Sequence, residues 1–468
     1  MAKEIIINGE DFAKGIGTSS YTGLEEVRCC DINNKPGIIR ASITTAKNSG
    51  ATVTDFIRYS RKDSGDNIFM VSGITPPKLY KRTSAGIWSN IATLTETGLV
   101  TGLEVWKDYV LVLFSSEIVT IKISDGTENK AFQSLTAGIH PSIVGPDDKV
   151  YIGNEQTIAS LAEDTTFDPT SGDTYTIDKN ALDLPDGVSA TTLTFLGSKL
   201  YIGTSEGTIY PWDTTSTSFD LPITVVKGQA INSMITANQR LYIQSGDKMK
   251  IYVSDGNSIA PYYELPETLI GNDYQLGAVR REAMVAIQDK LYIGFGSGSV
   301  LSPLGIYSID LNTKQTVLEH IISTGEDGST NGIYIGTIIA TNKDEPSFLY
   351  SWKDLLAAGD LYGVDGDTST EYTGDKAYFT SRFYQVGTAF NKATFETIQG
   401  TLAKPMVGND IVKIYYRKSK AGTFSLIATF DTDGIQSFET GTGIYDATEV
   451  QFRVFLNNEA ELLELRIK

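Results

Sequence analysis

The tetrapeptide Leu200-Tyr-Ile-Gly203 recurs along the chain and indicates the fold. Further copies begin at Val150, Leu241, Leu291 and Ile333, and weaker ones at Ile68 and Val110. The copies start 40 to 50 residues apart, and most are followed by a short polar turn and another strand-like run. That period is the length of one four-stranded propeller blade, which buries its apolar faces only against its neighbours. The repeat therefore predicts a β-propeller of about seven blades, with six or eight left open because the first two copies are weak.

The rest of the chain has the same all-β character. Apolar residues alternate or cluster in short runs of Val, Ile, Tyr, Phe and Thr, separated by Gly, Asn, Asp and Ser, which is typical of short strands and tight turns. The best helical candidate is Ser351–Gly359, at one or two turns. Several strand-like runs end in Asp, which favours turns because an Asp side chain accepts hydrogen bonds from its own backbone.

We predict four segments. Residues 1–45 supply N-terminal strands that close the propeller, with 37–43 as the strand that completes its last blade. Residues 46–362 form the propeller, and the polar, turn-rich stretch 363–375 is a linker. Residues 376–468 form a β-sandwich. Its seven predicted strands span 377–385, 393–403, 411–418, 424–430, 436–439, 450–456 and 462–467.

The charge of the chain excludes some partners. Its 468 residues include 57 acidic and 39 basic side chains, a net charge of −18, so a basic clamp on nucleic acid is not expected. Residues 131–370 hold 13 basic and 30 acidic side chains, which is almost the whole excess. This excess has two interpretations: a surface that repels DNA passing along a conduit, or ordinary solubility.

Few residues are suited to catalysis. The chain has two histidines, His140 and His320, and no nucleophile elbow, zinc helix or phosphate loop. We therefore predict no enzyme activity, no catalytic residues and no cofactor, with His140 structural or solvent-facing. A glycosidase is disfavoured because the sugar-stacking residues it needs are few. The four tryptophans are expected to pack between blades instead: Trp88, Trp106, Trp212 and Trp352.

Metal and disulfide chemistry are not expected either. The pairs Asp365/Asp367 and Asp431/Asp433 could suggest calcium, but no twelve-residue loop ending in Glu follows, so turn residues are the simpler interpretation. Cys29 and Cys30 are adjacent, and a disulfide between neighbours is strained. We expect two small strand residues there. No apolar run reaches the length of a secretory signal or a membrane helix, so we expect folding in a cytosol.

In this setting the chain resembles tail hub or nozzle proteins of short-tailed bacteriophages. The segments that carry the resemblance follow one another along nearly the whole chain: Lys14-Gly-Ile-Gly17, Cys30-Asp-Ile-Asn-Asn-Lys-Pro-Gly-Ile-Ile39, the Tyr-Ile-Gly repeats, Tyr415-Tyr-Arg-Lys-Ser-Lys-Ala-Gly-Thr-Phe424, Val450-Gln-Phe-Arg-Val-Phe455 and Leu465-Arg-Ile-Lys468. The resemblance implies a structural virion protein, assembled in the host cytoplasm. Its copies would form a ring, for which a hexamer is one option, below the portal and adaptor. That ring would enclose the exit channel for the genome and support fibres or a plug.

Two other functions stay open from the sequence. One is a propeller that binds carbohydrate or a receptor at a tail tip or cell surface, through loops on one face. The other is an extracellular or periplasmic hydrolase, which the missing signal and motifs disfavour. The ring interpretation predicts a homo-oligomer that contacts adaptor, portal-side proteins and fibres, lets DNA pass without sequence-specific binding, and has no membrane-spanning segment.

Overall fold

The structure is a computed structural model that describes residues 4–17, 23–32, 35, 37–48, 53, 55–72, 75–246, 249–265, 278–300, 303–341, 347–388 and 391–468. Within these ranges the chain is all-β, as predicted, apart from the short helix α1 (Gly9–Phe12). The described residues contain no helix with the length and apolar character needed to span a bilayer. Part of the 30–39 segment, residues 33, 34 and 36, lies outside the described residues.

Five successive segments each fold into a separate four-stranded antiparallel sheet, with the strands side by side in chain order. The first sheet contains β6 (Tyr59–Lys62), β7 (Ile68–Ser72), β8 (Lys78–Arg82) and β9 (Trp88–Thr93). The second contains β10 (Val100–Trp106), β11 (Tyr109–Phe114), β12 (Glu117–Lys122) and β13 (Glu128–Ser134). The third contains β14 (Ser142–Val144), β15 (Val150–Asn154), β16 (Thr157–Glu163) and β17 (Tyr175–Asp183). The fourth contains β18 (Ala190–Leu196), β19 (Lys199–Thr204), β20 (Thr208–Trp212) and β21 (Ile223–Thr224). The fifth contains β22 (Ile231–Ala237), β23 (Arg240–Ser245), β24 (Lys250–Ser254) and β25 (Ile259–Glu264).

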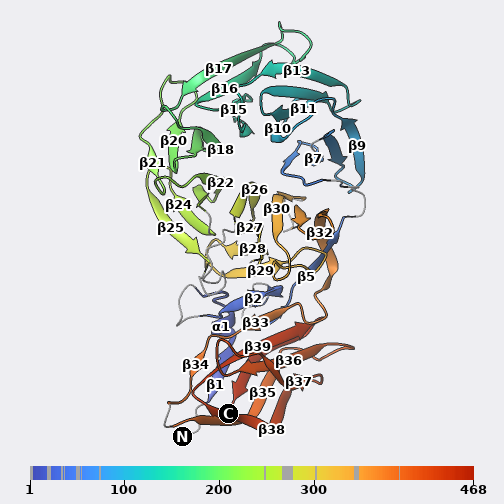
Figure 1. The fold of residues 1–468 in the computed structure, drawn as a ribbon, viewed down its shortest axis with the longest axis vertical. Coiled ribbons are helices and arrows are strands. Elements are labelled where there is room, and N and C mark those ends of the chain that lie inside the picture. The colour runs from blue at the N-terminus through green and yellow to red at the C-terminus, as the bar shows by residue number, and fades with distance from the viewer. Residues whose placement is uncertain are drawn as a thin grey trace.

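Two further groups of four strands follow. The sixth contains β26 (Ala278–Ile287), β27 (Lys290–Gly296), β28 (Gly305–Asp310) and β29 (Thr316–His320). The seventh contains β30 (Ile333–Ala340), β31 (Phe348–Asp354) and β32 (Leu361–Glu371), and its outer strand is the N-terminal β5 (Ile43–Lys47). The groups follow one another around a ring, with the first strand of each toward the centre (Figure 1).

Apolar side chains fill the space between successive groups. One cluster joins the first and second sheets through residues such as Phe69 and Val112. Similar clusters join the second to the third, the third to the fourth and the fourth to the fifth. A small cluster that includes Ile68 and Leu349 joins the seventh group to the first. The large core cluster contains residues of the fifth, sixth and seventh groups, such as Tyr242, Leu291 and Ile335, so packing continues around the whole ring.

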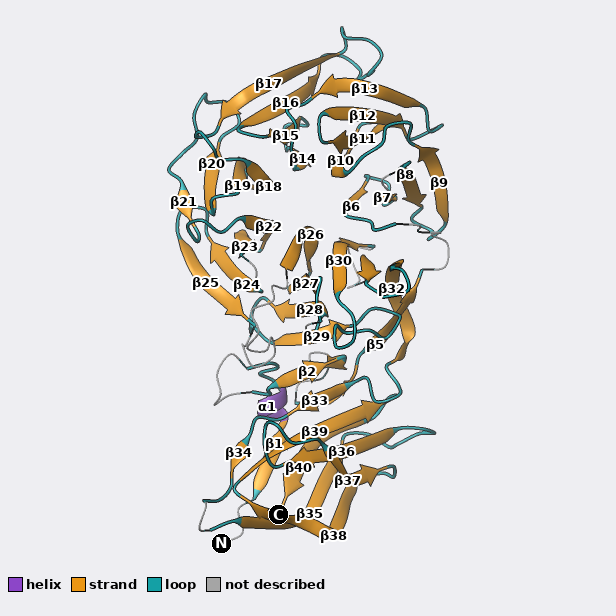
Figure 2. Cartoon of the chain, in the orientation of Figure 1, coloured by secondary structure: helices purple, strands orange, loops and turns teal. Residues whose placement is uncertain are grey.

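A second region, which we call the terminal region, combines strands from both ends of the chain (Figure 2). One sheet has the order β3-β4-β40-β35-β38, with β1 also paired to β40. Its strands are β1 (Ile5–Asn8), β3 (Cys30–Asp31), β4 (Ile39–Ala41), β35 (Ala393–Leu402), β38 (Ile435–Ala447) and β40 (Glu461–Ile467). The other contains β2 (Glu26–Arg28), β33 (Tyr378–Thr380), β34 (Tyr384–Gln385), β36 (Ile411–Arg417), β37 (Ser425–Phe430) and β39 (Glu449–Asn457). Strand β2 pairs with both β33 and β29, so this sheet continues into the ring.

The prediction for residues 1–45 was wrong in its main part. Most N-terminal strands join the terminal region: β1 and β4 both pair with β40. The predicted strand 37–43 is divided at Ser42, whose N–H donates to the carbonyl of Cys29 (2.8 Å). Only the segment after Ser42, strand β5, pairs with β32 in the ring. The sequence pattern could not reveal this division because both strands are short and similar in composition.

The predicted linker 363–375 was also wrong, because β32 covers its larger part. Two of its glycines were interpreted as turn residues, yet they make room for neighbouring side chains. A Cβ on Gly363 would lie 2.4 Å from the indole of Trp352, and one on Gly366 would lie 2.8 Å from Leu349. Val364 and Asp365 are fully buried.

The predicted helix 351–359 was wrong too, since Ser351 and Trp352 lie in β31. This strand pairs with β30 on one side and β32 on the other, and such tertiary pairing outweighs a weak helical propensity. The Ser351 hydroxyl also donates to the carbonyl of Ile57 (2.7 Å) and accepts from the N–H of Thr337 (3.1 Å).

One copy of the repeat lies in a different place from the others. The copies at Ile68, Val110, Val150, Leu200, Leu241 and Leu291 fall in the second strand of their groups, whereas Ile333 begins the first strand, β30. The second strand of the seventh group is β31, with Leu349-Tyr350 at its start. The described residues contain seven groups, but in the seventh the second strand is formed by residues Phe348–Asp354 and not by the copy of the repeat at Ile333.

Candidate functional site

The centre of the ring is crossed by charged side chains from its inner strands. Arg61 on β6 donates from Nε to Glu104 on β10 (3.0 Å) and from one terminal nitrogen to Glu282 on β26 (2.6 Å). Its other terminal nitrogen donates to the carbonyl of Ser142 on β14 (3.2 Å). One arginine thus connects the first, second, third and sixth groups.

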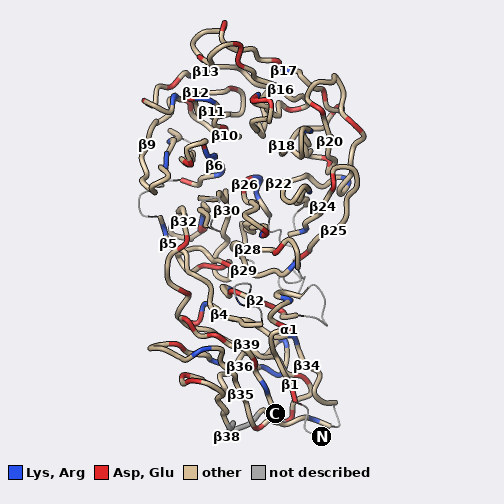
Figure 3. Tube along the Cα trace, turned by 180° about the vertical axis from the view of Figure 1, so that it is seen from behind, with Lys and Arg blue, Asp and Glu red and all other residues tan. Residues whose placement is uncertain are grey.

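A second arginine makes a similar connection. Arg281 on β26 donates to the carbonyl of Thr101 on β10 (3.1 Å), which joins the sixth group to the second across the ring. Its own carbonyl accepts from the hydroxyl of Ser233 on β22 (2.7 Å). Figure 3 shows basic positions at the inner strands β6 and β26. At this level the axis of the ring is occupied by protein, and we call these residues the axial network.

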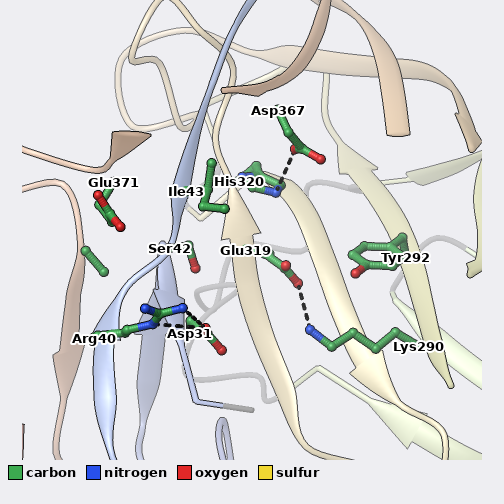
Figure 4. A pocket seen from close by; sticks show the side chains of 11 residues that line it. Asp31, Arg40, Ser42, Ile43, Lys290, Tyr292, Glu319, His320, Asp367 and Glu371 are labelled. Carbon is green, nitrogen blue, oxygen red and sulfur yellow. Dashed lines mark hydrogen bonds and ion pairs between the residues drawn. The ribbon is translucent and has the colours of Figure 1, made fainter. Parts of the chain in front are cut away.

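A candidate for a ligand site lies elsewhere, where the sixth and seventh groups meet the N-terminal segment. It is a cavity of about 370 Å³, a size in the range of small-molecule sites, and we call it the junction cavity (Figure 4). Strands β3 to β5 supply one side, β27 and β29 a second, and β32 a third. The lining residues are Asp31, Arg40, Ala41, Ser42, Ile43, Lys290, Tyr292, Glu319, His320, Asp367 and Glu371.

The charged groups of the junction cavity are partly paired. Arg40 donates to Asp31 (3.0 and 3.2 Å), and Lys290 lies 3.8 Å from Glu319. Glu371 has no ion pair or hydrogen bond from its side chain among the described residues. Carboxylates therefore outnumber cations in this cavity.

His320 and Asp367 form the most perturbed pair in the cavity. His320 is 3% exposed, and its Nε2 lies 3.6 Å from Asp367. Burial lowers the pKa of His320 to about 4. Burial, with a contribution from the nearby Glu319 charge, raises the pKa of Asp367 to about 7. At neutral pH the imidazole is uncharged, and the carboxyl is divided between its two protonation states.

A second cavity of about 390 Å³ lies between the ring and the terminal region. Two of its three arginines are paired with carboxylates: Arg28 with Asp327, and Arg453 with Glu26 (3.0 Å), whereas Arg417 donates to Gln451 (2.6 Å). The Tyr378 hydroxyl also donates to Glu26 (2.7 Å). These contacts connect β2 to both neighbouring regions, so this cavity is part of the attachment between them.

Residues singled out in the sequence are mostly structural. His140 is fully buried, so the solvent-facing alternative was wrong. One of its ring nitrogens lies 2.8 Å from the carbonyl of Gly153 and the other 3.0 Å from that of Ser115. Cys29 and Cys30 are buried and carry free thiols.

The tryptophans occupy different groups of the ring. Trp106 and Trp212 belong to clusters between neighbouring groups, and Trp106 donates from its indole to the carbonyl of Asp148 in the next sheet (2.8 Å). Trp88 packs against the cluster between the seventh and first groups, and Trp352 lies in the large core cluster.

The two aspartate pairs differ in setting. Asp365 and Asp367 lie within strand β32, so their interpretation as turn residues was wrong. Asp365 accepts from the N–H and hydroxyl of Ser323 (2.8 Å each). Asp431 and Asp433 lie between β37 and β38, as predicted for turn residues. Within the described ranges, no three His, Cys, Asp or Glu side chains are grouped in a way that could hold a metal ion.

Sequence reasoning missed the junction cavity. Its residues come from six strands in three distant parts of the chain and share no motif. His320, as one of two histidines, and Asp367, as half of an aspartate pair, were both singled out, but nothing in the sequence indicates that they are partners.

Comparisons with known proteins add little. No protein-family model matches the chain, and no curated protein matches its sequence. Among solved structures, the crystal structure of the computationally designed Ika8 protein is similar, with a TM-score of 0.40 and 14% sequence identity. The match covers 72% of this chain and 96% of that one. We draw nothing on function from a similarity at that level.

Proposed function

We propose that this chain is a seven-bladed β-propeller with a terminal β-sandwich, and that it serves as a structural protein of a bacteriophage tail. In this proposal it is a hub or nozzle subunit whose copies form a ring below the portal and adaptor. The proposal rests on the order of sequence segments that resemble such proteins. It is supported by the seven consecutive four-stranded groups and by the sheet that runs from the sixth group through β2 into the terminal region. It has no catalytic role.

The observation that carries the proposal of self-association is an apolar edge on the terminal region. Strands β37 and β38 end the two sheets of this region. Leu426 on β37 is 53% exposed, and Ile435 on β38 is 66% exposed. An unpaired strand edge with exposed apolar side chains is a common site of association. In the proposed ring this edge contacts a second copy of the chain.

The axial network restricts where DNA could pass. Arg61 and its carboxylate partners occupy the centre of each propeller, so a genome-exit channel would be enclosed by several copies together. The acidic excess of residues 131–370 would then repel DNA from the outer surface of the propellers that faces this shared channel.

Imaging of the purified full-length protein by negative stain, together with gel filtration, tests this proposal. A closed annulus of several copies is expected. A stable monomer that binds glycans on an array would contradict it and favour the receptor-binding alternative.

The edge itself is tested by Leu426→Lys combined with Ile435→Lys, which should convert the annulus to monomers. Leu221→Lys is the matched control, because Leu221 is 88% exposed but lies in the ring region. Equal assembly of both variants would show that the edge is not the contact between copies.

A further inference from the structure

The junction cavity combines a volume of about 370 Å³ with carboxylates that have no Lys or Arg partner among the described residues. In the second cavity, between β2 and its neighbours, two of the three arginines are paired with carboxylates, and the third, Arg417, donates to Gln451 and to the carbonyl of Lys420. The axial network is likewise matched, since Arg61 binds both Glu104 and Glu282.

Two carboxyl groups on β32 lie on either side of Ile43 in this cavity (Figure 4). Asp367 and Glu371 both line it, and neither has a Lys or Arg partner among the described residues. Asp367 faces the buried His320, which is uncharged at neutral pH and so does not neutralise it. The two cations of the cavity are already engaged: Arg40 with Asp31, and Lys290 with Glu319.

A second observation also points to a missing partner. His320 is 97% buried and lines the cavity, and its Nε2, which is directed toward Asp367, lies 3.6 Å from that carboxyl, beyond hydrogen-bond distance (Figure 4). A buried polar atom without a partner costs free energy, so such atoms are usually satisfied by protein, water or ligand. The cavity is large enough to admit a small ligand, and Tyr292 provides an aromatic wall.

We propose that the junction cavity binds an ammonium group, with Asp367 and Glu371 as its counter-charges and His320 as a neutral hydrogen-bonding partner. The ammonium has two sources that share this chemistry, a free polyamine or a lysine side chain of a partner protein. This site is independent of the proposed tail function.

Binding should depend on pH through Asp367, because only its ionised form attracts the cation. Its raised pKa means that binding at neutral pH releases a proton, and that affinity increases as the pH rises through about 7. The other charged or titratable groups that line the cavity are Asp31, Arg40, Lys290, Tyr292, Glu319, His320 and Glu371, and of these His320 lies 3.6 Å from the carboxyl and the charge of Glu319 acts on it. Of these, His320 titrates near pH 4, below the tested range.

The experiment is calorimetric titration of the full-length protein at pH 6 and pH 8 with two probes, 1,4-diaminobutane and Nα-acetyl-lysine amide. The ionised fraction of Asp367 changes about tenfold between these conditions, so affinity should be about tenfold higher at pH 8. Binding enthalpies measured near pH 7 in buffers of different ionisation enthalpy should show proton release. Preference for the diamine identifies a free polyamine, and preference for the lysine amide identifies a partner side chain.

The variant Asp367→Asn should lose at least tenfold in affinity and its dependence on pH. Asn has the shape of the protonated carboxyl, and Glu371→Gln provides a second variant should the first fail to fold. Asp431→Asn is the matched control, because it removes the same charge from an exposed turn far from the cavity. Absence of binding by both probes, or equal affinity in the wild type and both cavity variants, would overturn the proposal.

Discussion

The glycine that ends the Leu-Tyr-Ile-Gly phrase is required by close packing between groups. A Cβ on Gly294 would lie 2.4 Å from Cγ2 of Ile335 in the seventh group, and one on Gly203 would lie 2.9 Å from Ile231 in the fifth. Contacts this short cannot be accepted without movement of the neighbouring strand. The glycine of the repeat is therefore needed because adjacent sheets pack too closely at this position to admit a Cβ atom.

Replacement of Gly294 by Ala should destabilise the protein by about 1–3 kcal/mol, because the added methyl overpacks the space between two sheets. Chemical denaturation followed by tryptophan fluorescence measures this change. Gly172→Ala is the control, since a Cβ there meets nothing within 4 Å. Equal unfolding curves for the two variants would contradict the packing explanation.

The shifted pKa values of His320 and Asp367 predict opposite effects of pH on the free energy of unfolding. The folded pKa of Asp367 is raised to about 7, so the stability it contributes is present at low pH and lost as pH rises through 7. The folded pKa of His320 is lowered to about 4, so its contribution is present above its ordinary 6.5 and lost as pH falls toward 4. Between pH 4 and 6.5 unfolding moves one proton from the carboxyl to the imidazole, and the two effects cancel.

Single variants should separate these effects. Relative to the wild type, Asp367→Asn should gain stability as pH rises from 4 to 7, and His320→Gln should lose stability as pH rises from 4 to 6.5. Each change should be about 1 kcal/mol or more across its window. Thermal unfolding at half-unit pH intervals measures both. Parallel curves for the two variants would show that the two groups do not titrate as described.

At the scale of elements, the hairpins between the third and fourth strands of several groups share one turn. In the sixth group, Oδ1 of Asp310 accepts from the N–H groups of Asn312 (2.9 Å) and Thr313 (2.7 Å). Asp213 and Asp255 make the same contacts in the fourth and fifth groups. These bonds to Ser216 and Thr215 lower the pKa of Asp213 to about 2.

Asp310→Ala should weaken the β28–β29 hairpin by about 1 kcal/mol, because the two turn N–H groups lose their acceptor. Asp310→Asn is the control, since its amide oxygen can replace Oδ1. Amide hydrogen exchange in β28 and β29 measures the effect. Faster exchange in both variants would indicate that charge, and not the acceptor, stabilises the turn.

The sequence predicted most strands because their apolar residues and Asp or Gly turns are local signals. In the terminal region, predicted strands such as 411–418 and 462–467 match β36 and β40 closely. Prediction from the sequence failed where a strand is defined by its pairing with strands distant in the chain. Strand β32 contains polar residues and glycines that resemble a loop, and only its position between β31 and β5 makes it a strand. The junction cavity could not be predicted for the same reason, since its residues meet only in the folded chain.

At the scale of the whole molecule, Arg61 connects the sixth group to the first, second and third groups across the centre of the ring. Its guanidinium is paired with Glu104 and Glu282, whose charges would be left in the centre of the ring without it. Burial raises the pKa of Glu104, and the pairing with Arg61 opposes this effect. The ring is therefore sensitive to loss of one side chain.

Arg61→Met should cost about 3–5 kcal/mol, because it leaves two carboxyl groups near the axis without a cation. The triple variant Arg61→Met, Glu104→Gln, Glu282→Gln should recover part of this loss. Thermal unfolding compares the two. A triple variant less stable than the single one would show that the carboxylates stabilise the ring by other contacts.

The outer strand of the seventh group has a consequence for synthesis of the protein. Strand β5 is translated before every other strand of the ring, but its partner β32 is translated last among them, and the Thr368 hydroxyl that donates to the carbonyl of Thr44 lies 324 residues downstream. A ribosome-bound chain therefore holds one unpaired strand through nearly the whole of ring synthesis. Closure is a late event, and nascent chains halted before β32 would expose β5 to chaperones or to strands of neighbouring polysomes.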